Sequence, residues 1–247
     1  MIIDTHAYTR PEWQVHVNGL TWDAFSAATK RPLGICLHNT WRPTIASWTE
    51  TDPRRINGLN GLRAYYEGMG WHAGPHAFIS RQFINGFSPL TAWGIHSTCF
   101  NHTHIGLEMI GNYAAGAEPF DSGDGAMVRD NAVFAVAVLM AKLGLAPERD
   151  LVFHRDCSAD HHDCPGSGVG KPEMVARVRG AMNQLADATE MTPAPPAPVL
   201  GKYTVQPGDT LYRIALKFGT TFQAIALANH IPGPMFIITP GQVLNIP

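Results

Sequence analysis

The chain has 247 residues, of which 45% are hydrophobic and 15% charged, and its formal net charge is -2. This composition is typical of a folded globular protein with room for one large domain, or for a medium domain and a small one. The charge gives no electrostatic basis for binding nucleic acid. No apolar run approaches the roughly 18–20 residues that span a bilayer, which excludes a transmembrane protein.

Hydrophobic periodicity predicts strands that alternate with helices in the first three quarters of the chain. The expected strands cover residues 33–38, 76–80 and 105–111 and a segment that begins at Leu151, and the expected helices cover residues 55–69, 127–143 and 172–186. The residues before Leu33 show no clear pattern. Interleaved strands and helices predict an α/β sheet covered by helices.

A proline-rich stretch marks the domain boundary, because residues 193–198 contain four prolines and favour an extended spacer. We therefore expect a large domain over residues 1–187, a linker over residues 188–200 and a small domain over residues 201–247. In the small domain, alternating residues at each end and cap residues between them predict the order strand, helix, helix, strand. Asp209 or Thr210 would cap the first helix and Thr221 the second.

The small domain opens with Y-T-V-Q-P-G-D-T-L and ends with P-G-Q-V-L-N-I-P. Over its full length it resembles LysM modules, which implies a βααβ fold and binding to glycans that contain N-acetylglucosamine, such as peptidoglycan. The family pattern implies a glycan-binding groove formed by Gly208, Asp209, Thr210, Leu211, Ile231 and Pro232.

Residues 152–166 read V-F-H-R-D-C-S-A-D-H-H-D-C-P-G and crowd histidine, cysteine and aspartate into one loop after a strand. Such side chains are what a borderline-soft cation such as zinc selects. His154 and Cys164 supply two ligands most simply, and a third must come from elsewhere. His38 is the best candidate, because it ends a buried strand and the ends of strands meet at a sheet edge.

Other side chains of the loop leave alternatives open. Asp163, next to Cys164, is the alternative ligand and would bind through an oxygen. Asp156 could orient a ligand without binding the metal itself. Cys157 could be a ligand or pair with Cys164, although a free thiol is the default in a cytoplasm. We expect that compartment because the first ten residues lack the basic start and apolar core of a secretory signal.

Five motifs occur in a fixed order: L-H-N-T from Leu37, G-P-H-A-F-I from Gly74, the pair Ala92-Trp93, I-G-L-E ending at Glu108, and H-R-D followed by D-C-P-G. Together they resemble type 2 N-acetylmuramoyl-L-alanine amidases, which share their fold with peptidoglycan recognition proteins. The resemblance covers most of residues 30–187 and implies a central mixed β-sheet flanked by helices.

The resemblance also implies the site. Zn2+ would be bound by His38, His154 and Cys164, Glu108 would serve the attacking water, and His162 would stabilise the transition state. We further expect substrate contacts from His76, His96 and Trp93.

These residues predict a zinc-dependent amidase that cuts peptidoglycan between N-acetylmuramic acid and L-alanine, as a monomer held to the wall by LysM. Without a signal peptide, we expect a phage or prophage endolysin that is made in the bacterial cytoplasm and reaches the wall after membrane permeabilisation. The alternatives are a non-catalytic peptidoglycan recognition protein and a zinc endopeptidase that cuts a peptide bond.

Overall fold

The computed structural model describes residues 1, 3–190, 201–229, 231 and 238–247. The chain divides into two compact units, Met1–Leu185 and Ala186–Pro247. The proline-rich stretch and Pro232 of the expected glycan groove lie outside the described residues. Among the described helices, none has both the length and the apolar character needed to cross a membrane.

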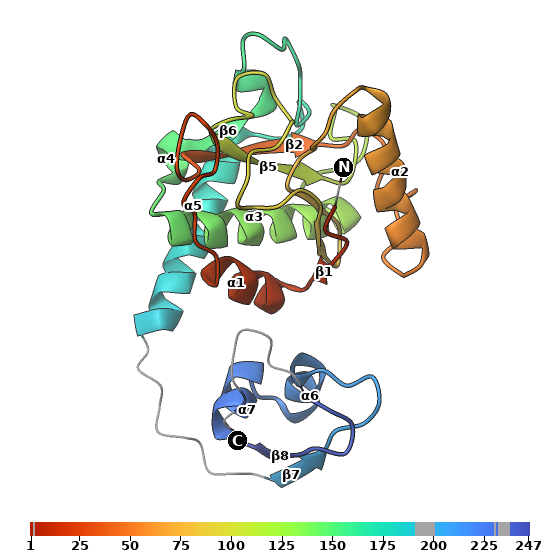
Figure 1. The fold of residues 1–247 in the computed structure, drawn as a ribbon, viewed down its shortest axis with the longest axis vertical. Helices are drawn as coiled ribbons and strands as arrows, with labels where there is room; N and C mark the ends of the chain where they lie inside the picture. Colours follow the sequence, from red (N-terminus) through yellow and green to blue (C-terminus); the bar gives the residue numbers. More distant parts are fainter. Residues whose placement is uncertain (2, 191–200, 230, 232–237) are drawn as a thin grey trace. The chain divides into compact units, whose positions relative to one another are not determined.

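The larger unit is a mixed six-stranded sheet with the strand order β1-β4-β3-β5-β2-β6 (Figure 1). Strands β3, β5, β2 and β6 run parallel, whereas β4 is antiparallel to both β3 and β1. The strands are β1 (Ala7–Tyr8), β2 (Gly34–Asn39), β3 (Ala77–Ile79), β4 (Ile84–Gly86), β5 (His104–Met109) and β6 (Leu151–Phe153). The helices are α1 (Arg10–Asn18), α2 (Arg54–Gly68), α3 (Gly123–Leu143), α4 (Pro147–Asp150) and α5 (Lys171–Glu190), and a 3-10 turn, η1 (His154–Asp156), follows β6.

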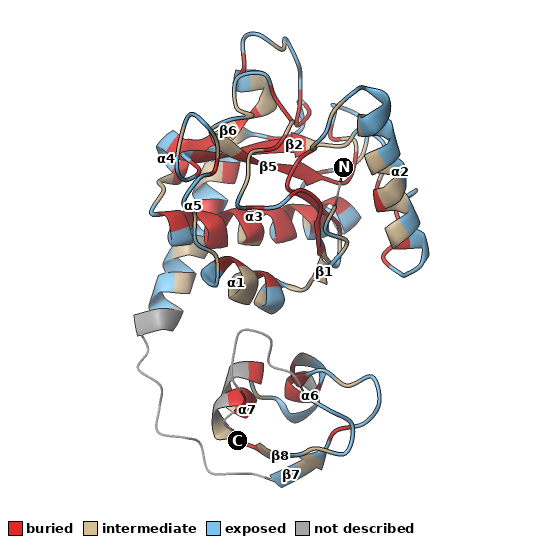
Figure 2. Ribbon diagram, viewed as in Figure 1, coloured by how far each residue is buried: buried red, intermediate tan, exposed pale blue. Residues whose placement is uncertain are grey.

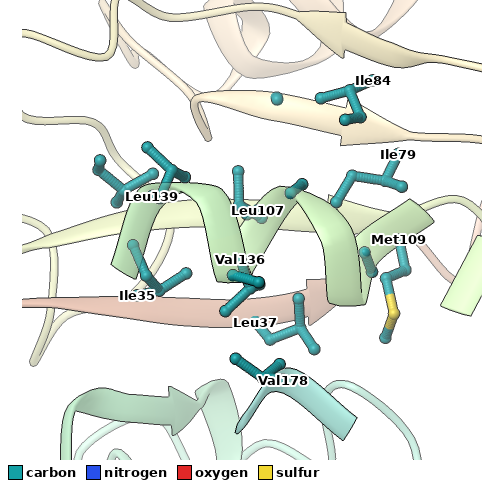
Figure 3. Packing of buried hydrophobic residues seen from close by; sticks show 14 of the residues in the cluster. Ile35, Leu37, Ile79, Ile84, Leu107, Met109, Val136, Leu139 and Val178 are labelled. Atoms are coloured by element: carbon teal, nitrogen blue, oxygen red, sulfur yellow. The ribbon is translucent and has the colours of Figure 1, made fainter. Parts of the chain in front are cut away.

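The two faces of the sheet are covered differently, since successive side chains of a strand point to opposite faces. Ile35 and Leu37 of β2 and Leu107 of β5 pack against the buried helix α3 and form the main core with it (Figures 2 and 3). Helix α2 contributes Leu59 to a second cluster, which contains Phe78 from β3. The alternate residues of β2 and β5 thus face away from α3.

The seven elements expected in the larger unit are confirmed, with ends that differ by a few residues. The missed helix α1 lies in the part before Leu33, where a start signal was nevertheless present. The side chain of Glu12 accepts hydrogen bonds from the backbone N–H and hydroxyl of Thr9, and Pro11 stands in the first turn. Trp13 and Val17 then bury one face of this short helix.

The smaller unit has the order β7 (Gly201–Thr204), α6 (Leu211–Phe218), α7 (Phe222–Ala228) and β8 (Val243–Ile246), with β7 antiparallel to β8. The expected order of strand, helix, helix and strand is confirmed. The hydroxyl of Thr210 accepts a hydrogen bond from the backbone N–H of Arg213 at 3.2 Å, and Thr221 caps the second helix in the same way.

Candidate metal centre

The carboxyl ends of three parallel strands bring two of the expected ligands, His38 and His154, together with Glu108. His38 of β2 lies in register with Glu108 of β5, and Leu37 lies in register with Phe153 of β6. His154 directly follows β6, so it arrives beside His38. Active sites of sheets that contain parallel strands commonly lie at this edge.

Donor atoms of His38, His154 and Cys164 converge. The Nδ1 atoms of the two histidines are 3.1 Å apart, and the Sγ of Cys164 is 3.7 Å from Nδ1 of His38. The backbone N–H of Asn39 also donates to that sulfur at 3.2 Å. These three side chains form one of two groups among the described residues that could hold a metal ion.

The separations fit zinc. Tetrahedral zinc, with bonds of about 2.0–2.1 Å to nitrogen and 2.3 Å to sulfur, sets its nitrogen donors about 3.3 Å apart and nitrogen from sulfur about 3.6 Å apart. Burial and the neighbouring histidines lower the pKa of His38 well below its usual range, so the ring is neutral and its lone pair is available. Burial raises the pKa of Cys164, so a cation that binds there releases the thiol proton.

The second group contains Cys36, His38 and His96 and shares one residue with the first. It uses the other ring nitrogen of His38, because Nε2 of His38 lies 3.0 Å from Nδ1 of His96. All three side chains are buried, whereas His154 in the first group is half-buried. A catalytic zinc needs an open position for water, which favours the first group.

His96 therefore stands behind a ligand. If Nδ1 of His38 faces the metal, Nε2 of His38 donates its proton to Nδ1 of His96, and Nε2 of His96 donates in turn to the carbonyl of His104 at 3.2 Å. The ring of His96 lies against the backbone of Gly106, where an added Cβ would overlap it. The glycine of the I-G-L-E motif thus makes room for the support of His38.

Asp160 supports the second expected ligand, His154, and no sequence pattern had pointed to it. Its Oδ2 accepts a hydrogen bond from Nε2 of His154 at 2.9 Å. Asp156 had been a candidate for orienting a ligand. It instead accepts a hydrogen bond from the backbone N–H of Phe153 and pairs with Lys171. No spacing rule marks Asp160, because its contact depends on how the loop folds back.

Glu108 and His162 flank the ligands. Burial raises the pKa of Glu108 to about 8, and its Oε2 has no hydrogen-bonding partner among the described residues. The exposed ring of His162 stacks on His154 with centroids 4.7 Å apart. Its Nδ1 accepts a hydrogen bond from the backbone N–H of Cys164, which places the proton of the neutral ring on Nε2.

The expected substrate contacts lie in different surroundings. His76 is buried, and both ring nitrogens are engaged, since Nδ1 accepts from the backbone N–H of Gly106 and Nε2 donates to the carbonyl of Ala92. His96 is likewise buried behind His38. Trp93 is half-buried, with its ring in contact with the ring of His72 on one side and of His102 on the other.

The expectation of a free thiol at Cys157 is wrong. Cys99 and Cys157 form a disulfide, with Cα atoms 5.6 Å apart, whereas Cys36 and Cys164 are free and buried. Cys157 is thus neither a ligand nor the partner of Cys164. The expectation rested on a compartment inferred from the amino terminus, whereas the fold brings together two cysteines that are 58 positions apart in the sequence.

Asp163 belongs to neither metal-binding group of the described residues. Its carboxylate is 66% exposed and lies 3.7 Å from the guanidinium of Arg155.

In the smaller unit, four of the expected glycan-binding residues that are described, Gly208 to Leu211, lie at the start of α6, and Ile231 follows α7. Gly208 has a φ of 86°, which favours glycine, and Leu211 and Ile231 are buried. The carboxylate of Asp209 accepts hydrogen bonds at 2.8 Å from the Tyr203 hydroxyl and from the backbone N–H of Gln206. Asp209 therefore stabilises the turn rather than capping the helix, which Thr210 does.

Residues 203–247 match the LysM domain family, and residues 28–167 match the family described as N-acetylmuramoyl-L-alanine amidase. A curated relative, the N-acetylmuramoyl-L-alanine amidase sle1 of Staphylococcus aureus, is 37% identical over 75 residues, which are 30% of this chain and 21% of that protein. The chain thus spans about a fifth of the length of the curated relatives that it matches.

Two solved structures resemble the chain at lower identity. The N-acetylmuramoyl-L-alanine amidase LysC from Clostridium intestinale is 21% identical, with a TM-score of 0.48 over 65% of this chain and 94% of that one. Drosophila PGRP-LB is 18% identical, with a TM-score of 0.47 over 65% of this chain and 86% of that one. The family match covers more than half of the chain, so the chain belongs to the N-acetylmuramoyl-L-alanine amidase family.

Proposed function

We propose that the chain is a zinc-dependent amidase that hydrolyses the bond between N-acetylmuramic acid and L-alanine in peptidoglycan. The observation that carries this proposal is the convergence of His38, His154 and Cys164 at the sheet edge where Glu108 holds an unpaired carboxyl oxygen. Membership of the amidase family supports the same reaction.

Zinc bound there would polarise the amide carbonyl and lower the pKa of water to about 7. Glu108 is the base that takes the proton from water and later gives it to the leaving amine. A nearby cation favours its carboxylate form and opposes the burial that otherwise keeps it protonated. The Nε2–H of His162 donates a hydrogen bond to the oxyanion of the tetrahedral intermediate.

We infer that peptidoglycan is bound at two places, the metal centre and the LysM unit. The match of residues 203–247 to the LysM family supports this inference. A linked wall-binding unit raises the local concentration of substrate without tight binding at the metal centre. The endolysin role and the monomeric state stay predictions.

Mass spectrometry of a peptidoglycan digest, together with metal analysis of the purified protein, tests the proposal. An amidase leaves intact glycan strands and releases peptides with a free amino group on L-alanine. Fragments cut within the stem peptide would instead identify an endopeptidase. A protein without zinc and without products would be a recognition protein.

A further inference from the structure

One short segment, residues 96–98, contacts His38 directly and His154 through Asp160, and a disulfide joins the residue that follows this segment to the loop after His154. We propose that Asp160 is a positioning residue for zinc binding by His154, and that the Cys99–Cys157 disulfide clamps the segment that holds Asp160. The inference rests on the proposed function, since it takes the trio of His38, His154 and Cys164 as the zinc site.

Three donors converge on one oxygen of Asp160. Its Oδ2 accepts hydrogen bonds from Nε2 of His154 at 2.9 Å, from the hydroxyl of Ser97 at 2.8 Å and from the backbone N–H of Thr98 at 2.9 Å. A carboxylate only accepts, so Nε2 of His154 carries the ring proton. Nδ1 of His154 is then left unprotonated, and it faces Nδ1 of His38. Asp160 thereby fixes both the tautomer and the orientation of the ligand.

The same segment supports the other histidine ligand. Nδ1 of His96 lies 3.0 Å from Nε2 of His38, one residue before Ser97. The side-chain oxygen of Asn101 accepts hydrogen bonds from the backbone N–H groups of His96 and Ser97 at 2.6 and 2.7 Å. Residues 96–98 therefore form one ordered turn that contacts the outer nitrogen of one ligand and the carboxylate behind the other.

The disulfide joins the two partners of this arrangement. Cys99 directly follows Thr98, and Cys157 begins the turn in which its carbonyl accepts from the backbone N–H of Asp160 at 3.3 Å. The Sγ–Sγ bond thus lies next to the hydrogen bonds between Asp160 and residues 97–98. Opening it would leave the contact between these two loop segments to hydrogen bonds near the protein surface, where water competes with them.

The first test measures zinc affinity by competition with a chromophoric chelator. Asp160→Ala should bind zinc about tenfold to a hundredfold more weakly than the wild type, as is usual when the partner of a ligating histidine is removed. Asp160→Asn keeps an acceptor oxygen and should lose less. Asp163→Asn is the matched control, because it removes an exposed carboxylate from the same loop without removing a hydrogen bond to a ligand side chain. Its affinity should stay within about twofold of the wild type.

The second readout is cobalt(II) in place of zinc, whose visible absorption reports the geometry of the site. Asp160→Ala should change the shape of these bands as well as the affinity, because the ring of His154 is free to turn. A merely structural residue would lower thermal stability and leave the bands of the bound cobalt unchanged.

The third test is a cycle of substitutions at the clamp. Cys99→Ala/Cys157→Ala should weaken zinc binding, and adding Asp160→Ala should cost little more, because both changes disrupt one arrangement. Independent, multiplying losses would overturn the clamp, and an Asp160→Ala protein with wild-type affinity and spectrum would overturn the positioning role. A wild type that binds no zinc would instead refute the zinc site of the proposed function, so the two failures are distinguishable.

Discussion

Four of the histidines at the candidate metal centre differ in role according to what each ring nitrogen contacts. His38 and His154 turn Nδ1 toward each other and toward Cys164, and each is held through Nε2. His96 holds His38, whereas His76 joins two backbone segments. The role of each histidine therefore depends on the contacts of both of its ring nitrogens.

Two buried free cysteines allow a matched test of the ligand set. Cys164→Ala should lose most of the bound zinc and with it the amidase activity, because one of three ligands is gone. Cys36→Ala should retain both, since Cys36 belongs only to the closed group behind His38. Metal analysis after exhaustive dialysis checks both variants. Zinc lost from Cys36→Ala and kept by Cys164→Ala would move the metal to the other side of His38.

Removing the proposed base should lower the rate of hydrolysis without changing zinc binding. Glu108→Gln should lower kcat by about a hundredfold to ten-thousandfold, the usual contribution of a general base. Its zinc content should stay that of the wild type, because Glu108 is not among the expected ligands. Steady-state kinetics with a soluble muramoyl peptide measures the first quantity, and a variant with wild-type kcat would remove Glu108 from the mechanism.

The same variant should change how stability depends on pH in the metal-free protein. Folded Glu108 keeps its proton up to about pH 8, whereas an unfolded glutamate releases it near about pH 4.3. The folded state thus binds the extra proton between these values, so the wild-type free energy of unfolding falls as pH rises through this window. Glu108→Gln should remove a slope of at most about 1.4 kcal/mol per pH unit. Denaturant unfolding at several pH values, compared with the wild type, measures it.

Candidate site residues could be predicted from the sequence where their position in a strand or motif is fixed by spacing. His38 ends a buried strand, and Cys164 precedes a Pro-Gly pair, so both could be singled out in advance. Asp160 could not, because the contact that matters arises from a loop that folds back onto its own histidine. The disulfide was missed for a related reason, since its cysteines meet only in three dimensions.

At the scale of secondary structure, strand β5 makes space for the site by means of a glycine. Gly106 lies one position after a core residue and two before Glu108, on the face of the sheet that bears His38. The ring of His96 occupies the volume that any larger side chain would need. Strand β5 therefore provides both a carboxylate and the space for the support of a ligand.

Gly106→Ala should displace His96 and weaken zinc binding, with a cost of about 1–3 kcal/mol in folding stability from overpacking. Gly61→Ala is the control, because an added Cβ there meets nothing within 4 Å and the residue lies in helix α2. That substitution should be neutral or stabilise the protein, since alanine favours a helix. Thermal unfolding and zinc competition on both proteins compare them, and equal zinc affinity would show that His96 adapts without consequence for His38.

The elements of the larger unit that the sequence did not predict are short. Helix α3, expected from its periodicity, is apolar almost all round and lies buried against the sheet. Helix α1 has nine residues and buries two, which is too few for periodicity to mark, although its start signal at Thr9 and Glu12 was readable. Strands β1 and β4 are two and three residues long, and they form by pairing with neighbouring strands, β1 with β4 and β4 also with β3.

At the scale of the molecule, the chain has two units with separate cores. The smaller unit buries its own set of apolar residues from both helices and from β8, among them Leu211, Ile225 and Leu244. The larger unit contains every expected metal ligand. Hydrolysis and wall binding are therefore expected to be separable by truncation.

A chain that ends at Thr192 should lose activity on whole cell walls while keeping most of its activity on a short soluble muramoyl peptide. The reason is that the tether raises the local concentration of the enzyme at an insoluble wall, whereas hydrolysis of a soluble peptide gains nothing from it. Turbidity loss of wall suspensions and chromatography of the peptide digest give the two rates. Equal losses on both substrates would mean that LysM does not act as a tether.

The alternation of side chains in β2 and β5 has a practical consequence for protein engineering. In β2 and β5 the odd-numbered residues Ile35, Leu37, Ile105, Leu107 and Met109 face α3, and the alternate positions, which include His38, Gly106 and Glu108, face away from it. Combinatorial libraries for heat resistance can thus be confined to the odd positions and their partners in α3. Directed evolution on that side would explore core packing while leaving the proposed site residues of these strands unaltered.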